Sequence, residues 1–321
     1  MLRIHFTPED LARTRISAGP QPMWEILLST NRLRERDGDV VFGGWRRSVA
    51  ARTPATTRLL TDLAPVVGYA VDFLTPTGTA LTLDDALETL RSTPQRRLRT
   101  DLAVLAGSRK LPAWTVSLAN GCPDTLRRLV EAVDRYFAVC LAPYWARVRA
   151  RVDQERARTG ATLADSGWES VLERLHPTAR WRYPVLEVGY PVEHDLHLNG
   201  RGLHLVPSFF CRGLPTTFLD AEFEPTLVYP IEHAVGWAEA DPTQPLAALL
   251  GRTRARVLES LGERPGTTSD VASRTGTSLP TASQQAGTLR AAGLVQTRQN
   301  GQSVLHSITP LGRALLNRSV V

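Results

Sequence analysis

Apolar residues in the first half of the chain recur at the three- and four-residue spacing of amphipathic helices. Pro22 opens one such stretch, and residues 82–106 predict two further short helices. The longest apolar stripe runs from Leu126 to Val148, with charged side chains on the opposite face. Pro143 lies inside that stripe and should kink the helix. The first half of the chain is therefore expected to be mostly helical.

From about residue 180 the pattern changes to the alternation of β-strands. Residues 195–205 alternate on both sides of Asn199 and Gly200, a dipeptide typical of two-residue hairpin turns. This register puts leucines on one face of the predicted hairpin and places Asp195 opposite His204 on the other. We expect that second face to be a solvated sheet surface.

A polar segment with two prolines, residues 239–246, separates two differently patterned regions. We place a domain boundary there, with an α+β domain over residues 1–240 and a second domain over residues 241–321. Residues 226–231 predict another strand of the first domain, and residues 2–6 predict an edge strand.

The second domain begins with an amphipathic pattern that predicts one helix over residues 246–261. Thr267 then caps a short helix, Gly276 supplies a turn, and Ser278 is suited to the N-cap of the next helix, 279–292. Helix, tight glycine turn and helix is the order that a helix-turn-helix DNA-binding motif requires.

The second helix of this motif has two different faces. Leu279, Ala282, Ala286 and Leu289 follow helical spacing and predict one buried face. The opposite face carries short, uncharged hydrogen-bonding side chains that suit base edges in the major groove, where a glutamine can pair with adenine. An ordinary solvated helix surface is the alternative interpretation.

A second predicted hairpin follows directly, which favours the DNA-binding interpretation. Strands are expected over 295–299 and 302–308 about an Asn-Gly turn, so that residues 294–308 would form a wing, and a last helix follows Pro310. Arg298, near the tip, is placed for phosphate or minor-groove contact. The predicted DNA contacts are Ser278, Thr281, Ser283, Gln284, Gln285, Thr288, Arg290, Arg298, Asn300, Gly301 and Gln302.

The charge distribution agrees with this placement. The 321 residues include 38 basic and 32 acidic ones, a net charge of +6. Residues 246–321 hold nine arginines and three acidic residues, so the whole excess lies in this segment and residues 1–245 are balanced. We expect the second domain alone to face a polyanion.

These residues carry a resemblance to a known family. The matching segments of the second domain are Leu250–Arg254 (LGRTR), Thr267–Ala272, Gly276–Ser278, Ala282–Ser283, Leu289–Val295 (LRAAGLV), Gly301 and His306–Gly312 (HSITPLG). Residues 246–321 resemble the ArsR-type winged-helix regulators, particularly the long two-domain members of actinobacteria, whose start is similar to Ile4–Arg13. The resemblance implies a homodimer that places two recognition helices in successive major grooves of double-stranded DNA and represses transcription. By analogy, the first domain would sense a small-molecule effector.

Two departures from the family pattern limit which properties of the family can be expected of this chain. Many relatives have histidine where this chain has Gln285, so the base preference stays open. Metal-sensing relatives use cysteines, histidines and acids in this region. Residues 246–321 contain no cysteine and one histidine, His306, so we expect no metal sensing there.

Two alternatives for the first domain stay open. A cluster of carboxylates and histidines could bind zinc or iron, although a solvated sheet face also accounts for it: Glu193, His194, Asp195, His197, His204, Glu232 and His233. A group of aromatic residues could line an effector pocket or belong to the core: Trp24, Trp45, Trp114, Tyr144 and Trp145.

Catalytic motifs are missing from the sequence. It contains no GxSxG, HExxH or GxxxxGK[ST] motif, so we expect a regulator with no cofactor. An enzyme domain fused to a winged helix is the competing class.

The cysteines and the apolar runs bear on cellular location. The three cysteines are far apart and fit a reducing compartment. The apolar run 63–71 is far shorter than a membrane span, and we expect a cytoplasmic protein.

Overall fold

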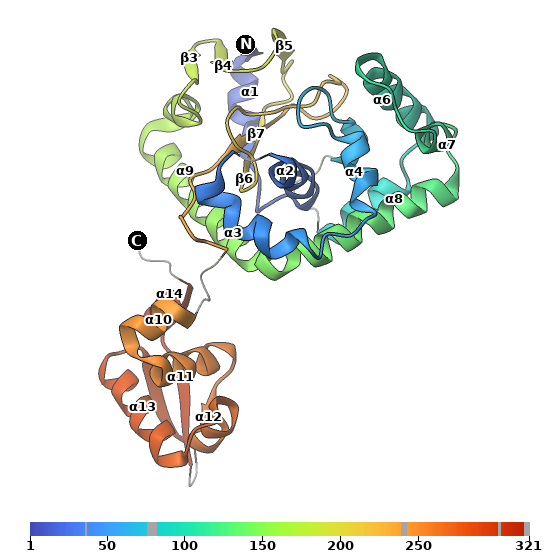
Figure 1. Cartoon of the computed structure of the whole chain (residues 1–321). Coiled ribbons are helices and arrows are strands. Elements are labelled where there is room, and N and C mark those ends of the chain that lie inside the picture. The colour runs from blue at the N-terminus through green and yellow to red at the C-terminus, as the bar shows by residue number, and fades with distance from the viewer. Residues whose placement is uncertain (36, 76–81, 239–242, 301–302, 318–321) are drawn as a thin grey trace. The chain divides into compact units, whose positions relative to one another are not determined.

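Helices and small sheets alternate along the chain, so the fold is of the mixed α and β type that the sequence indicated. The computed structural model describes residues 1–35, 37–75, 82–238, 243–300 and 303–317. The chain divides into two units, Met1–Trp237 (unit 1) and Ala238–Val321 (unit 2) (Figure 1). Each unit has its own core and is taken by itself below.

The helices of unit 1 surround one central helix, α2 (Pro22–Arg34), as Figure 1 shows. Nearly every residue of α2 is buried. The other helices are α1 (Pro8–Arg13), α3 (Asp39–Ala50), α4 (Thr57–Leu63), α5 (Leu83–Arg91), α6 (Gln95–Ser108), α7 (Trp114–Ala119), α8 (Pro123–Tyr136) and α9 (Trp145–Arg174). The predicted break at Pro143 is present, because a π-turn at Phe137–Leu141 and a 3₁₀ turn at Ala142–Tyr144 separate α8 from α9.

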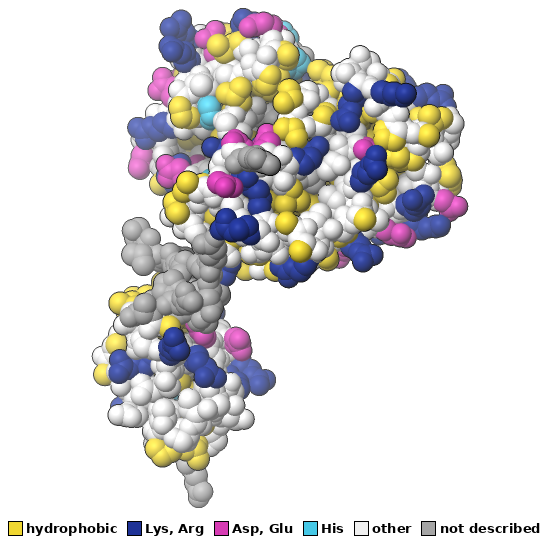
Figure 2. All heavy atoms as spheres, viewed as in Figure 1, with side chains coloured by type: hydrophobic (Ala, Val, Ile, Leu, Met, Phe, Trp, Pro, Cys, Tyr) yellow, Lys and Arg dark blue, Asp and Glu magenta, His cyan; other side chains and the backbone are white. Residues whose placement is uncertain are grey.

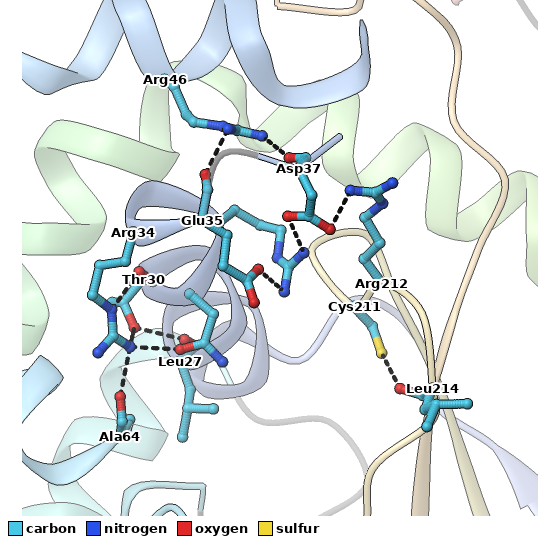
Figure 3. A network of polar contacts seen from close by, with 12 residues as sticks. Leu27, Thr30, Arg34, Glu35, Asp37, Arg46, Ala64, Cys211, Arg212 and Leu214 are labelled. Atoms are coloured by element: carbon cyan, nitrogen blue, oxygen red, sulfur yellow. Dashed lines mark hydrogen bonds and ion pairs between the residues drawn. The ribbon is translucent and has the colours of Figure 1, made fainter. Parts of the chain in front are cut away.

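Charged side chains fix the end of α2 to neighbouring segments (Figure 3). The Arg34 guanidinium donates to the backbone carbonyls of Thr30 (3.0 Å) and Ala64 (2.5 Å). Arg46 donates to the carbonyl of Glu35 (2.6 Å), and Arg212 pairs with Asp37 (2.6 Å). The end of the central helix is therefore held by hydrogen bonds and ion pairs that are internal to unit 1.

Two small sheets complete unit 1. The first has the strand order β3 (Arg180–Arg182), β4 (Val185–Val188), β1 (Leu2–His5) and β5 (His194–His197). The second is parallel, with the order β2 (Arg15–Ile16), β6 (His204–Ser208) and β7 (Thr226–Pro230). The predicted edge position of residues 2–6 is wrong, because β1 pairs with β4 on one side and with β5 on the other.

The predicted hairpin over residues 195–205 is also wrong. Asn199 and Gly200 do have the positive φ angles of a tight turn, 53° and 78°. However, β5 pairs with β1, and the chain then crosses to the second sheet. At Gly202 an added Cβ would lie 2.6 Å from the backbone of Arg13, so glycine permits this crossing. The turn was predictable from local preference, but the partner strands lie far away in sequence.

Unit 2 contains the helices α10 (Thr243–Leu250), α11 (Arg252–Glu263), α12 (Thr268–Thr275), α13 (Leu279–Ala291) and α14 (Pro310–Asn317). The single helix expected over 246–261 is divided, because Gly251 has φ 84° and ψ 146°, outside the helical region. A three-stranded antiparallel sheet has the order β8 (Gly266–Thr267), β10 (Ser303–Ile308) and β9 (Val295–Asn300).

The core of unit 2 is aliphatic. Val257, Leu258 and Leu261 of α11 pack with Val271 of α12 and Leu289 of α13, all at most 1% exposed. Ile308, Leu315 and Leu316 cover this cluster from the sheet and α14. Unit 2 thus holds α13 against a packed core.

Candidate nucleic-acid interface

The turn between α12 and α13 is built by three local features. Thr267 and Asp270 form a capping box at the start of α12, and Gly276 ends that helix in the left-handed conformation, with φ 62°. Ser278 then caps α13, where its hydroxyl oxygen accepts a hydrogen bond from the backbone N–H of Thr281 (3.3 Å). The predicted caps and turn at these positions are present.

The face of α13 that packs on the core is narrower than predicted. Ala282 and Ala286 are fully buried and Leu289 is 1% exposed. Leu279 was expected on this face, but it is 54% exposed. It is the first residue of α13, between the exposed Ser278 and Pro280, and lies beyond the cluster that covers the rest of the helix.

The opposite face of α13 is polar and carries no carboxylate. Ser283, Gln284 and Thr288 are exposed, and Thr281 is half-buried. The Thr288 hydroxyl donates to the carbonyl of Gln284 (3.0 Å), and the Thr281 hydroxyl contacts Ser278 Oγ (2.8 Å). Within the described residues, the side-chain amide of Gln284 makes no hydrogen bond, so both its donor and its acceptor face solvent.

Gln285 differs from Gln284. It is half-buried at the side of α13 that faces α11, and its Oε1 accepts a hydrogen bond from Nε of Arg254 (2.8 Å). Arg254 is exposed. The sequence predicted two equivalent glutamines, whereas the structure gives one free amide and one that is already engaged.

The hairpin after α13 comprises β9 and β10, in which Arg298 lies opposite Leu305 and is exposed. Arg290, near the end of α13, is also exposed. Asn300 ends β9, and its side chain is not among those described. Gly301 and Gln302, also expected to contact DNA, lie outside the described residues, as does the expected start of the second strand at residue 302; the described part of that strand is Ser303–Ile308.

His306 joins three elements of unit 2. It is 6% exposed, and its Nδ1 contacts the Thr297 hydroxyl (2.9 Å) while its Nε2 contacts the Thr268 hydroxyl (3.0 Å). Burial, together with the positive charge of Arg290, lowers the pKa of His306. From the sequence, this residue was weighed as a metal ligand and as part of the family-like segment 306–312, without a structural role. The alternation of β10 puts His306 on the same face as Ile308, which packs against the core of unit 2, and that pattern was the available indication of a structural role.

Three exposed arginines near α13 have no acidic partner in the part of unit 2 that the structure describes. Within the described part of unit 2, no carboxylate lies within ion-pair distance of Arg254, Arg290 or Arg298. On the face of unit 2 drawn in Figure 2, arginines stand out from a mostly uncharged surface. Their charge therefore remains available to an external anion.

The metal-ligand cluster considered for unit 1 is not assembled. Glu193 pairs with Arg3 (2.6 Å), and Asp195 pairs with His5 (2.8 Å) instead of with His204. His204 is 3% exposed, and burial lowers its pKa to about 4. His233 lies against the carbonyl of Phe209 (2.5 Å). Among the described residues, no three histidine, cysteine or acidic side chains come close enough together to hold a metal ion.

The aromatic residues considered for an effector pocket have separate places in unit 1. Trp45 is fully buried and donates to the carbonyl of Cys140 (2.9 Å), and Trp114 donates to Asp62 (3.0 Å).

Unit 1 contains a small cavity and a larger cleft among its described residues. The small cavity is apolar, lies beside α2, is lined in part by Met23 and Leu74, and measures about 10 Å³, about the space of one water molecule. A larger open cleft of about 350 Å³ lies along β5, lined by His194, Asp195, Leu196, His197, Asn199, Arg201, Leu219 and Ala221.

Comparison with known proteins gives no relative: no protein-family model, curated protein or solved structure matches this chain. None of the helices in the described residues is long and apolar enough to cross a membrane.

Proposed function

We propose that unit 2 is a winged helix-turn-helix domain that binds double-stranded DNA, and that the protein is a transcription regulator. In this proposal α13 enters the major groove as the recognition helix, and the β9–β10 hairpin is the wing. The observation that carries the proposal is the outer face of α13, which is uncharged, rich in hydrogen-bonding groups and flanked by exposed arginines that have no acidic partner among the described residues.

Each part of this surface supports a separate component of binding. Exposed arginines such as Arg290 and Arg298 would contact phosphates, which gives affinity without sequence preference and a steep salt dependence. The free amide of Gln284 would read a base edge, because an amide with one donor and one acceptor can pair with adenine in the major groove. The resemblance to ArsR-type regulators further supports a homodimeric repressor whose first domain senses an effector.

A selection experiment tests the proposal. The full-length protein is incubated with a pool of random DNA duplexes, and enriched sequences are measured by fluorescence anisotropy. We expect saturable binding to an enriched, palindromic sequence. Failure to enrich any sequence at low salt, with and without a panel of small molecules, would contradict the proposal and favour the alternative that this domain contacts only protein.

The Gln284→Ala variant tests in the same experiment whether Gln284 reads a base. This variant should lose about 1–3 kcal/mol of binding free energy on the selected duplex and almost none on a scrambled one. Gln154→Ala, at an exposed position of α9 in unit 1, is the matched control and should leave both affinities unchanged. Equal losses on both duplexes would show that Gln284 does not read a base.

A further inference from the structure

The contact between Arg254 and Gln285 gives these two residues roles that their sequence positions did not indicate. Gln285 was expected to read a base. On the helical wheel of α13, however, Gln284 points away from the buried Ala282 and Ala286, whereas Gln285 lies at the edge of the buried face, toward α11. Its Oε1 accepts the hydrogen bond from Arg254 Nε at 2.8 Å.

This contact competes with the pairing by which Gln285 would read a base. The bidentate pairing with adenine needs the amide oxygen as an acceptor for the base amino group and the amide nitrogen as a donor. In Gln285 the oxygen is turned back toward α11 and is already bonded.

The same contact orients the guanidinium of Arg254. A guanidinium has five N–H donors in a fixed planar fork, and Gln285 takes the one on Nε. The donors on Nη1 and Nη2 make no hydrogen bond within the described residues, and no carboxylate there lies within ion-pair distance of Arg254. The N–H donors on Nη1 and Nη2 match the geometry of two oxygens of a phosphate group.

We infer that Arg254 is a contact to the DNA backbone beside the recognition helix, and that Gln285 is a positioning residue that holds it. The ligand of this site is a phosphodiester of double-stranded DNA. This inference rests on the proposed function, since it assigns one further contact to the same interface.

The test measures the affinity of the full-length protein for the selected duplex and for a scrambled duplex over a range of salt concentrations. Arg254→Ala should weaken binding to both duplexes by the same factor, about tenfold at low salt. It should also reduce the slope of log K against log salt by about 0.9, the value for one phosphate contact. Arg128→Ala, at an exposed position of α8, removes the same charge from unit 1 and should change neither quantity.

Two variants at Gln285 separate positioning from base reading. Gln285→Ala should give a smaller, equal loss on both duplexes and leave the base preference unchanged. Gln285→Glu should give a larger equal loss, because its carboxylate would pair with Arg254 and repel phosphate. A change of base preference at one position in Gln285→Ala, or an unchanged salt slope in Arg254→Ala, would overturn the inference. If the unmodified protein binds no DNA, the proposed function itself fails, so the two failures are distinguishable.

Discussion

The arginines of the two units have different surroundings. In unit 1, Arg97 is half-buried, lies within ion-pair distance of Asp101, Asp220 and Glu222, and is 4.2 Å from the centre of the Phe223 ring. In unit 2, Arg290 and Arg298 are exposed and have no carboxylate within ion-pair distance among the described residues. The same side chain therefore stabilises the fold in one unit and remains available for a partner in the other.

This difference explains why net charge is informative here. Unit 1 has many arginines, but acidic residues compensate them through internal contacts such as Arg32 with Glu35 (2.5 Å) and Arg212 with Asp37 (2.6 Å). In unit 2, Arg254, Arg290 and Arg298 are exposed and have no carboxylate within ion-pair distance among the described residues. We expect substitutions of arginine in unit 1 to change stability, and those in unit 2 to change binding.

The largest effect is expected for Arg97→Ala. This substitution leaves the buried Asp101, which is 2% exposed, and Asp220 without their cation, which should lower the free energy of unfolding by about 3–5 kcal/mol. Urea unfolding followed by tryptophan fluorescence measures this directly, because all seven tryptophans lie in unit 1. Arg127→Ala removes an exposed pair with Asp124 and should cost less than about 1 kcal/mol. Similar losses in both variants would contradict the comparison.

The next largest effect is the contribution of His204 to the pH dependence of the stability of unit 1. Burial lowers the pKa of His204 to about 4 in the folded protein, whereas the unfolded chain has an ordinary value near 6.5. As pH falls below 6.5, the unfolded state takes up a proton on this histidine that the folded state does not, so the contribution of His204 to the stability of unit 1 decreases between pH 6.5 and about 4. The contribution is about 3 kcal/mol. In His204→Leu this part of the pH dependence should disappear from the urea unfolding curves; an unchanged dependence would refute it.

The turn between α12 and α13 gives a smaller effect on stability, and a second glycine substitution in α13 serves as a control with an effect of opposite sign. Gly276 has φ 62°, and a Cβ there would meet only Arg256, at 3.8 Å, so Gly276→Ala should cost about 1–2 kcal/mol through backbone conformation alone. Gly287 is helical and has nothing within 4 Å of an added Cβ. Gly287→Ala should therefore stabilise unit 2 by about 0.5–1 kcal/mol. Circular dichroism of the two variants during urea unfolding measures both, and a cost at both positions would contradict the assignment of the turn.

Local sequence patterns predicted the elements of unit 2 better than the sheets of unit 1. The caps at Thr267 and Ser278 and the turn at Gly276 depend on neighbouring residues, and the structure has them where they were predicted. In unit 1, the Asn199-Gly200 turn is present, but the pairing of β5 with β1 joins residues about 190 positions apart, which no local pattern specifies.

The interface was likewise predictable only in part. The exposed polar face of α13 follows from helical spacing, since Ala282, Ala286 and Leu289 are buried. The hydrogen bond from Arg254 to Gln285 joins two helices 31 positions apart and depends on how α11 packs on α13. The sequence indicated Gln285 as a base contact and did not indicate Arg254 as a DNA contact, so the hydrogen bond between them could not be predicted.

The smallest effect on stability, and the most direct test, concerns Arg290 and Arg298. Arg290→Ala and Arg298→Ala should each change the free energy of unfolding by less than about 0.5 kcal/mol.

The decisive measurement is the salt dependence of the affinity of the full-length protein for duplex DNA, with each of these variants and with Arg128→Ala as the control. The account predicts a steep slope of log K against log salt, reduced by about 0.9 in each of the two variants and unchanged in the control. A slope near zero, or equal reductions in all three variants, would contradict the claim that the exposed arginines of unit 2 bind DNA.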